Sequence, residues 1–253
     1  MTTHDDPFYV YKTHRDASKQ VHILRGRLVV THPCGTLSYT KGIHQVLRDM
    51  QTVDPPTHET PPKTLQGPPR VGLHPLKFSA MEACVLSGVG TSPIERGRHL
   101  STCIETAFRS GKHTPDTKWL FESLEYAGLR ILCAEAPLVS FTRNFATFID
   151  LLCTTRDGTM VVVEVKRSCG GVSWMCGCLG TTAHEHGIHN SEKWFHGDLK
   201  GIRGCALGKA TAQAKLETLV LHEEYGIPKH RLLWMVAVFC GTNTSVCIVQ
   251  GKI

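Results

Sequence analysis

The chain has 253 residues, of which 41% are hydrophobic, and a formal net charge of +6 at pH 7. This composition excludes a disordered or fibrous chain, and the modest basic excess is compatible with a nucleic-acid partner. No apolar run reaches the length of a membrane span, and the first residues are polar, so we expect an intracellular protein (cytoplasm or nucleus) with no secretion signal and no membrane partner.

The first part of the chain is expected to stand apart from the rest. Residues 1–53 contain short strand-like runs and a possible helix over residues 43–50, and they carry no motif that indicates a role. Residues 54–70 contain six prolines, a composition typical of a semi-extended linker. We therefore predict an N-terminal segment over residues 1–53, a linker over residues 54–70, and one domain over residues 71–253.

The second part predicts an alternation of helices and strands. Apolar periodicity, caps and breakers predict helices, then three strands, then a helix and two final strands. The helices are expected at 76–86, 92–108, 117–126 and 207–225, and the strands at 129–139, 145–154, 160–167, 232–239 and 245–249. This order predicts an α/β fold with a central mixed β-sheet flanked by helices and a small N-terminal extension.

A hairpin within this region carries the chemistry. The loop 156–158, with Gly158 in the left-handed conformation, pairs Thr155 with Thr159 and places Asp150 opposite Glu164. Strand alternation puts Lys166 on the same face as Glu164. Burying such charges is costly unless they are paired or bind a metal. Two facing carboxylates suit a hard divalent cation such as Mg²⁺.

The hairpin resembles the core of the PD-(D/E)xK phosphodiesterase superfamily, in its RecB-like and lambda-exonuclease-like branches. Asp150, Glu164 and Lys166 match the motif, and Gln213 matches a glutamine that these branches carry on a later helix. Ile149 stands where many members have proline. The resemblance covers roughly residues 92 to 250. It implies a restriction-endonuclease-like core and a Mg²⁺-dependent (or Mn²⁺-dependent) nuclease. The resemblance alone also implies a DNA exonuclease of recombination or repair.

The resemblance also implies roles for individual residues. Asp150, Glu164 and the carbonyl of Val165 are expected to hold the metal, with Lys166 and Gln213 completing the catalytic set. A further metal-facing residue is expected on the first helix of the core, where Glu105 is slightly favoured over His99. Basic residues are expected to contact the nucleic acid, namely Arg143, Arg167, Lys200, Arg203 and Lys209.

Two alternatives remain open from the sequence. One is a nuclease fold without activity that serves as a nucleic-acid or protein-binding module. The other is a zinc-stabilised interaction protein built around residues 169–205, which contain several cysteines and histidines but no Cys-x-x-Cys pair.

Overall fold

A computed structural model describes residues 11, 21–24, 27–31, 37–52, 93–168, 193–202, 204, 206–240 and 246–253. The described strands are β1 (Val21–Leu24), β2 (Arg27–Thr31), β3 (Leu37–Tyr39), β4 (Lys41–Gly42), β5 (Gln51–Thr52), β6 (Arg130–Ser140), β7 (Phe145–Thr154), β8 (Met160–Ser168), β9 (Trp194–Phe195), β10 (Leu232–Cys240) and β11 (Val246–Lys252). The helices are α2 (Ile43–Asp49), α4 (Pro93–Ser110), α5 (Pro115–Tyr126) and α7 (Ala206–Glu223), with 3₁₀ turns η2 (Gly197–Leu199) and η3 (Lys229–Arg231).

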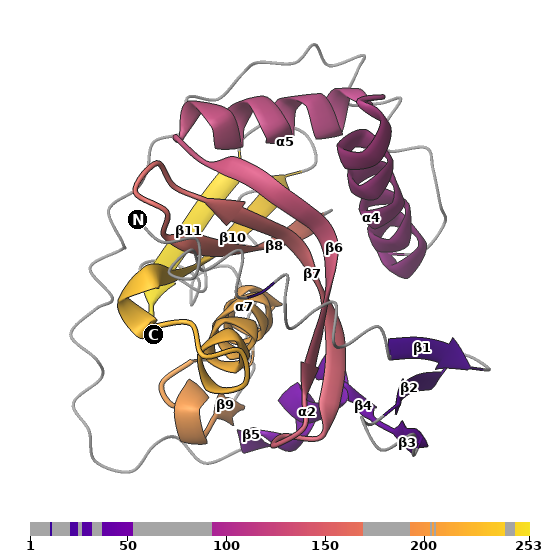
Figure 1. Ribbon diagram of the computed structural model, residues 1–253, viewed down its shortest axis with the longest axis vertical. Helices are drawn as coiled ribbons and strands as arrows, with labels where there is room; N and C mark the ends of the chain where they lie inside the picture. The colour runs from indigo at the N-terminus through magenta and orange to yellow at the C-terminus, as the bar shows by residue number, and fades with distance from the viewer. Residues whose placement is uncertain are drawn as a thin grey trace, which may run out of the picture.

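The main sheet is mixed, as predicted (Figure 1). Its strand order is β11-β10-β8-β7-β4, and β6 pairs antiparallel with β7. The β7–β8 and β10–β11 pairs are antiparallel, whereas β8–β10 and β4–β7 are parallel. The parallel β8–β10 pair requires a crossover connection, and α7 lies within that connection. The predicted α/β fold class is thus confirmed.

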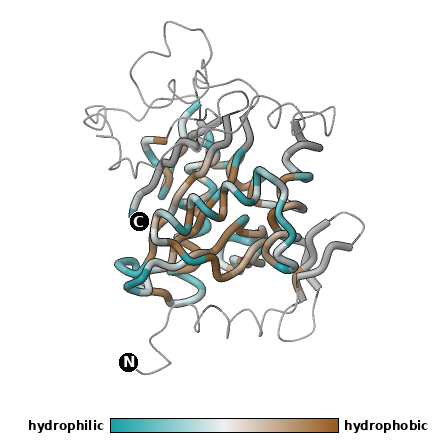
Figure 2. The backbone as a smooth tube through the Cα atoms, turned by 90° about the horizontal axis from the view of Figure 1, so that it is seen from above, coloured by the Kyte–Doolittle hydropathy of each residue, from teal (hydrophilic) through white to brown (hydrophobic). Residues whose placement is uncertain are grey.

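Helices cover both faces of the sheet (Figure 1). Val161, Val163 and Val165 of β8 pack with α4 and α5, whereas Met160 and Val162 pack with α7 on the other side. Helix α7 is buried over most of its surface, as expected for a helix that is apolar on several sides. In Figure 2 the sheet strands contain long hydrophobic stretches, while helical segments alternate between hydrophilic and hydrophobic residues.

The predicted hairpin loop is confirmed in detail. The Thr155 N–H donates to Thr159 O at 2.9 Å, and Gly158 has a φ of +79°, in the left-handed region that glycine tolerates. Arg231 clamps the same loop by donating to Gly158 O at 3.0 Å. The loop therefore fixes the register of β7 against β8.

Most predicted element bounds agree with the structure to within two or three residues. Helix α5 begins at Pro115, two residues before the predicted start, because Thr114 caps it and proline suits its first turn. The predicted helix over residues 76–86 and the linker over residues 54–70 lie outside the described residues.

Part of the N-terminal segment belongs to the main sheet and its core. Strand β4 pairs with the start of β7, and Ile43 and Leu47 of α2 are buried in the core beside α7. Tyr11 is fully buried; its hydroxyl donates to Pro137 O at 3.0 Å, and its ring stacks on Tyr225. Tyr11 and the β4–α2 segment therefore pack on described elements that follow residue 93, across the linker predicted over residues 54–70.

No described helix is both long and apolar enough to cross a membrane.

The packing of α2 makes a testable prediction. Leu47 is 3% exposed, so Leu47→Ala is expected to lower the free energy of unfolding by about 2–5 kcal/mol, through lost burial and a residual cavity. Arg48→Ala, at an exposed neighbouring position, is the control and is expected to change it by less than about 0.5 kcal/mol. Urea unfolding of both variants measures the difference. Equal stabilities would mean that α2 is not part of the folded core.

Candidate functional site

The candidate site lies where two strands of the sheet separate. The pairing of β7 with β8 ends at Leu151 and Val163. Beyond that point Asp150 replaces the backbone partner, since its Oδ2 accepts the Val165 N–H at 2.7 Å. A carboxylate that accepts a backbone N–H at a strand junction is held in a fixed orientation. Continuing the register places Asp150 beside Glu164, as the hairpin pattern predicts.

Glu164 is the centre of the polar contacts. It is fully buried and forms an ion pair with Lys166 through Oε1. Its Oε2 accepts a hydrogen bond from Gln213 Nε2 at 2.9 Å. The same Gln213 nitrogen donates to Oε1 of the buried Glu217 at 3.1 Å, so one amide of α7 joins two carboxyl groups. The strand pair and α7 thus bring together four residues predicted from sequence: Asp150, Glu164, Lys166 and Gln213.

Glu135 of β6 adds a carboxyl group that the sequence reasoning missed. Ala134 pairs with Leu151 and Ala136 with Ile149, which places Glu135 across from Asp150. Glu135 has a φ of +48°, a left-handed conformation that costs a non-glycine residue about 1–2 kcal/mol. Its Oε1 is buried and has no hydrogen-bond partner among the described residues. Such strain and an unmatched polar atom are typical of functional sites.

The strands bend at this point. Ile149 packs in the core beneath α7, whereas Leu151, two residues later, packs in the core beneath α4 and α5. Residues two apart in a regular strand would share one face. The side chains of β7 therefore switch from one face of the sheet to the other at Asp150. Glu135, which lies opposite on β6, has a left-handed backbone, so both strands are irregular at their acidic residues.

The carboxyl groups are crowded and poorly solvated. Burial, followed by the charge of Asp150, raises the pKa of Glu164 to about 8 against the opposing effect of Lys166. Burial and Asp150 likewise raise the pKa of Glu135 to about 7. Burial also raises the pKa of Asp150 and, together with Glu164 and Asp150, that of Glu217. The single ammonium nearby does not offset so many acidic groups.

Lys166 responds in the opposite direction. Burial alone would lower its pKa, but Glu164 and Asp150 outweigh burial and raise it. Lys166 is therefore a cation at neutral pH, held against Glu164 and partly exposed at its side chain. A permanent cation suits charge stabilisation better than proton abstraction.

The predicted helix residues differ in their relation to the cluster. Glu105 forms an ion pair with Arg109, yet it lies near enough to Glu135 to raise that group's pKa. His99 is exposed and contacts Cys103 Sγ at 3.4 Å, one turn along α4. Glu105 therefore contributes to the electrostatics of the cluster, and its role as a metal-facing residue stays a prediction. The Val165 side chain packs beneath α4 and α5, on the face of the sheet opposite to the one on which Glu164 contacts α7.

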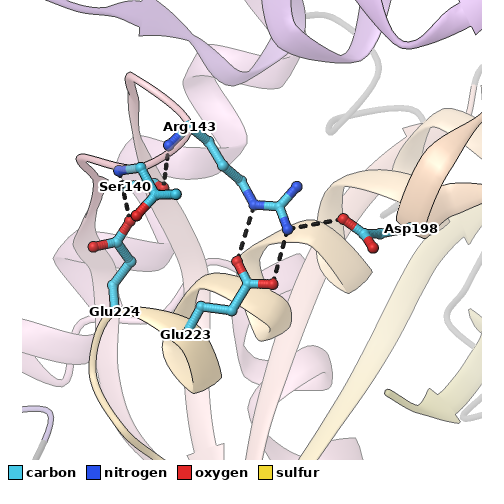
Figure 3. Close-up of polar contacts among 6 residues, drawn as sticks. Ser140, Arg143, Asp198, Glu223 and Glu224 are labelled. Carbon is cyan, nitrogen blue, oxygen red and sulfur yellow. Dashed lines mark hydrogen bonds and ion pairs between the residues drawn. The ribbon is translucent and has the colours of Figure 1, made fainter.

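Arg143 does not join the cluster. It lies in the β6–β7 turn and donates to Glu223 and Asp198, with its Nη2 at 2.8 Å from each (Figure 3). Ten residues of α7 separate Glu223 from Gln213, which at 1.5 Å per residue is about 15 Å. With its charge matched by two carboxylates at that distance, Arg143 serves as a structural ion pair between the turn, η2 and α7.

The other predicted basic residues lie on separate segments of the chain. Lys209 is exposed, one turn before Gln213 on α7, and Lys200 is exposed just after η2. Arg167 continues β8 and pairs through its backbone with Phe239. Arg203 lies outside the described residues, as does most of the Cys- and His-rich stretch 169–205.

Glu135 and Glu217 left weak signals in the sequence. Glu135 is a lone acid between two alanines of an apolar strand, and Glu217 follows Gln213 by one helical turn. Both patterns are common in proteins, and only the fold shows that they converge on Glu164. The positive φ of Glu135 has no signal in the sequence at all.

The donor chemistry fits a hard divalent cation, although the described residues hold no preformed group of three or more His, Cys, Asp or Glu side chains that could bind a metal. Lys166 and Gln213 contact the two oxygens of Glu164, and the Val165 N–H donates to Oδ2 of Asp150. The available donors are all carboxylate oxygens, including the unmatched Oε1 of Glu135, and these are the ligands that Mg²⁺ and Mn²⁺ prefer.

Comparison of the chain with protein-family models, with curated proteins and with solved structures finds no match.

The raised pKa of Glu135 predicts a pH-dependent effect of its removal. The folded protein retains a proton that the unfolded chain releases between pH 4.5 and about 7, so wild-type stability falls as pH rises through this window. Glu135→Gln has no carboxyl group at this position, so it does not lose stability in this pH window for that reason. Its unfolding free energy relative to wild type is expected to increase by about 1–2 kcal/mol from pH 4 to pH 8, after discounting for partial exposure.

Urea unfolding at both pH values measures this difference. Glu122→Gln, at an exposed position of α5, is the control and is expected to show the same small effect at pH 4 and pH 8. If Glu135→Gln also behaves identically at the two pH values, then Glu135 is not charged within a crowded cluster.

Proposed function

We propose that this protein is a metal-dependent nuclease of the PD-(D/E)xK type that hydrolyses phosphodiester bonds of nucleic acid, with DNA cleaved from an end as its most favoured activity. The observation that carries the proposal is the convergence of Asp150, Glu164, Lys166 and Gln213 from two strands and a helix. The preference for DNA and for ends rests on the sequence resemblance alone.

The order of elements supports the proposal. Helix α4 precedes the β6–β7–β8 meander, and α7 then returns the chain to β10, parallel to β8. This is the layout that the resemblance implies. Fold alone does not establish function, so the proposal depends mainly on the side chains at the strand junction.

A purely structural role explains these side chains poorly. Replacing a buried ion pair by apolar residues of similar size is often neutral or stabilising. Here Glu164 and Glu217 are fully buried, and both have raised pKa values. Glu135 adds backbone strain at the same place. A cluster that combines buried acids, whose pKa values burial raises, with backbone strain is better explained by chemistry than by stability.

Asp150, Glu164 and Glu135 are the residues proposed to hold Mg²⁺ or Mn²⁺, with Glu105 as an outer participant. A bound divalent ion would polarise the scissile phosphate and lower the pKa of water. A cation bound by Glu164 would compete with Lys166, which contacts Oε1 of Glu164 here. The Lys166 ammonium would then face the developing negative charge of the phosphate.

Gln213 has a positioning role in this scheme. Its Nε2 donates to both Glu164 and Glu217, so it fixes the orientation of Glu164 when Lys166 turns away. Glu217, with a raised pKa caused first by burial, retains a proton more readily than an ordinary carboxyl group. The Gln213–Glu217 pair can thereby support Glu164 without adding a full negative charge.

Removal of either central acid is expected to abolish cleavage while the fold survives. Asp150→Asn and Glu164→Gln each remove a proposed metal ligand and relieve crowded negative charge, so the thermal unfolding midpoint is not expected to fall markedly. Release of labelled nucleotides from DNA with Mg²⁺ or Mn²⁺ measures activity, and Glu122→Gln serves as the active control. Near wild-type cleavage by either variant would place the reaction elsewhere in the molecule.

Lys166→Ala is expected to lower the cleavage rate by about 10²–10⁴-fold, because a positioned charge-stabilising group is lost. Binding of Mn²⁺, measured by calorimetry, is expected to persist or to strengthen, since Glu164 loses its competing ion pair. A rate within a few-fold of wild type would make Lys166 a structural counter-ion only.

A binding module of the same fold without activity is the second candidate, favoured by the ion pair that occupies Glu164 and by the lack of a preformed metal group among the described residues. Digestion of end-labelled linear and closed circular DNA separates the possibilities. Products from linear DNA alone indicate an exonuclease, nicked circles indicate an endonuclease, and binding without cleavage indicates the second candidate.

A further inference from the structure

The edge of β7 that carries Asp150 is shared between two strands. Along its whole length β7 pairs with β6 on one side, so β8 and β4 must both lie on the other. Strand β8 takes residues 151–154, and β4 takes residues 145–146. Residues 147–150 lie between them and pair on this edge with none of the described strands. The candidate site therefore has β8 on one flank and the β4–α2 segment on the other.

The β4–α2 segment is anchored firmly in this position. Ile43 and Leu47 are buried against the core that includes α7, and α2 packs on both α7 and β7. After α2, β5 pairs with β9, and His196 N–H donates to Met50 O at 3.0 Å. The segment is held at both ends, so the position of its polar face relative to the site is fixed.

His44 is the residue of α2 that lies in the electrostatic neighbourhood of Lys166. Burial, then the charges of Lys166 and Arg48, lower the pKa of His44, so its imidazole is neutral at pH 7. The side chain is nevertheless exposed, and neither ring nitrogen has a hydrogen-bond partner among the described residues. A neutral imidazole presents a hydrogen-bond donor without adding a second positive charge to that of Lys166.

We propose that the N-terminal β4–α2 segment forms one wall of the substrate site and that His44 contacts a phosphate of the bound strand. This inference rests on the proposed nuclease function and extends it to a segment that carries none of the motif residues. Strand β8, which carries Lys166, and the β4–α2 segment, which carries the exposed His44, lie on the same edge of β7, on either side of residues 147–150. An anionic oxygen bound between these two flanks would receive a charged hydrogen bond from Lys166 and a neutral one from His44.

The test compares two histidine variants of the full chain. His44→Ala removes the proposed contact, and His44→Gln keeps a side chain that can donate a hydrogen bond. The matched control is His230→Ala, at an exposed histidine of η3. Residue 230 lies just before the Leu232–Met160 pair, six residues along β8 from Lys166, or about 20 Å in an extended strand.

Binding is measured with a fluorescently labelled single-stranded DNA oligonucleotide in EDTA, where no cleavage occurs. His44→Ala is expected to raise the Kd by about 3–30-fold, with His44→Gln intermediate and His230→Ala unchanged. In cleavage assays the same variant is expected to raise KM more than it lowers kcat. Chemical modification of wild-type histidines by diethyl pyrocarbonate is expected to show His44 protected by the oligonucleotide and His230 still reactive, a readout that needs no variant.

The outcomes separate this inference from the proposed function. If the wild type cleaves DNA but His44→Ala binds as well as His230→Ala and His44 is not protected, the wall proposal is overturned and the nuclease proposal stands. If the wild type binds but does not cleave, the enzymatic proposal fails, while the binding and protection data still decide the role of His44. A wild type that neither binds nor cleaves nucleic acid overturns both.

Discussion

The end of the β7–β8 ladder at Leu151 and Val163 is the constraint on which the candidate site depends. In a continued ladder, the Val165 N–H would be used by a backbone carbonyl. Because the strands separate, that donor is available to the Asp150 side chain, which accepts it at 2.7 Å. The separation also creates the space next to Glu164 into which Lys166 and Gln213 project their polar groups.

The same separation explains why residues distant in the sequence meet here. With β8 paired only to the end of β7, the remaining edge is available to β4, and α2 follows directly from β4. Negative charge then accumulates because elements that reach the junction contribute acidic side chains. Glu135 comes from β6 and Glu217 from α7.

Sequence patterns predicted the parts of this arrangement that are local or periodic. The Asp157-Gly158 loop and strand alternation fix the register of the hairpin. The position of Asp150 beside Glu164 therefore follows from local sequence within that hairpin. Gln213 follows from helical periodicity combined with the family resemblance. The pairing of β4 with β7 spans about a hundred residues, and a two-residue strand has no periodicity from which it could be recognised. The left-handed backbone of Glu135 could not be predicted either, because the sequence there favours an ordinary strand.

The ion pair between Glu164 and Lys166 can then be understood as one of two states of the cluster. In the structure described, Lys166 compensates Glu164, and the raised pKa values of Glu135 and Glu217 allow protons to reduce the remaining negative charge. A divalent cation would compensate the same carboxylates more completely and would have to displace both the protons and the ammonium. Release of Lys166 from Glu164 by the cation would leave its ammonium fully available to a phosphate, so that metal and substrate binding support each other through a single side chain.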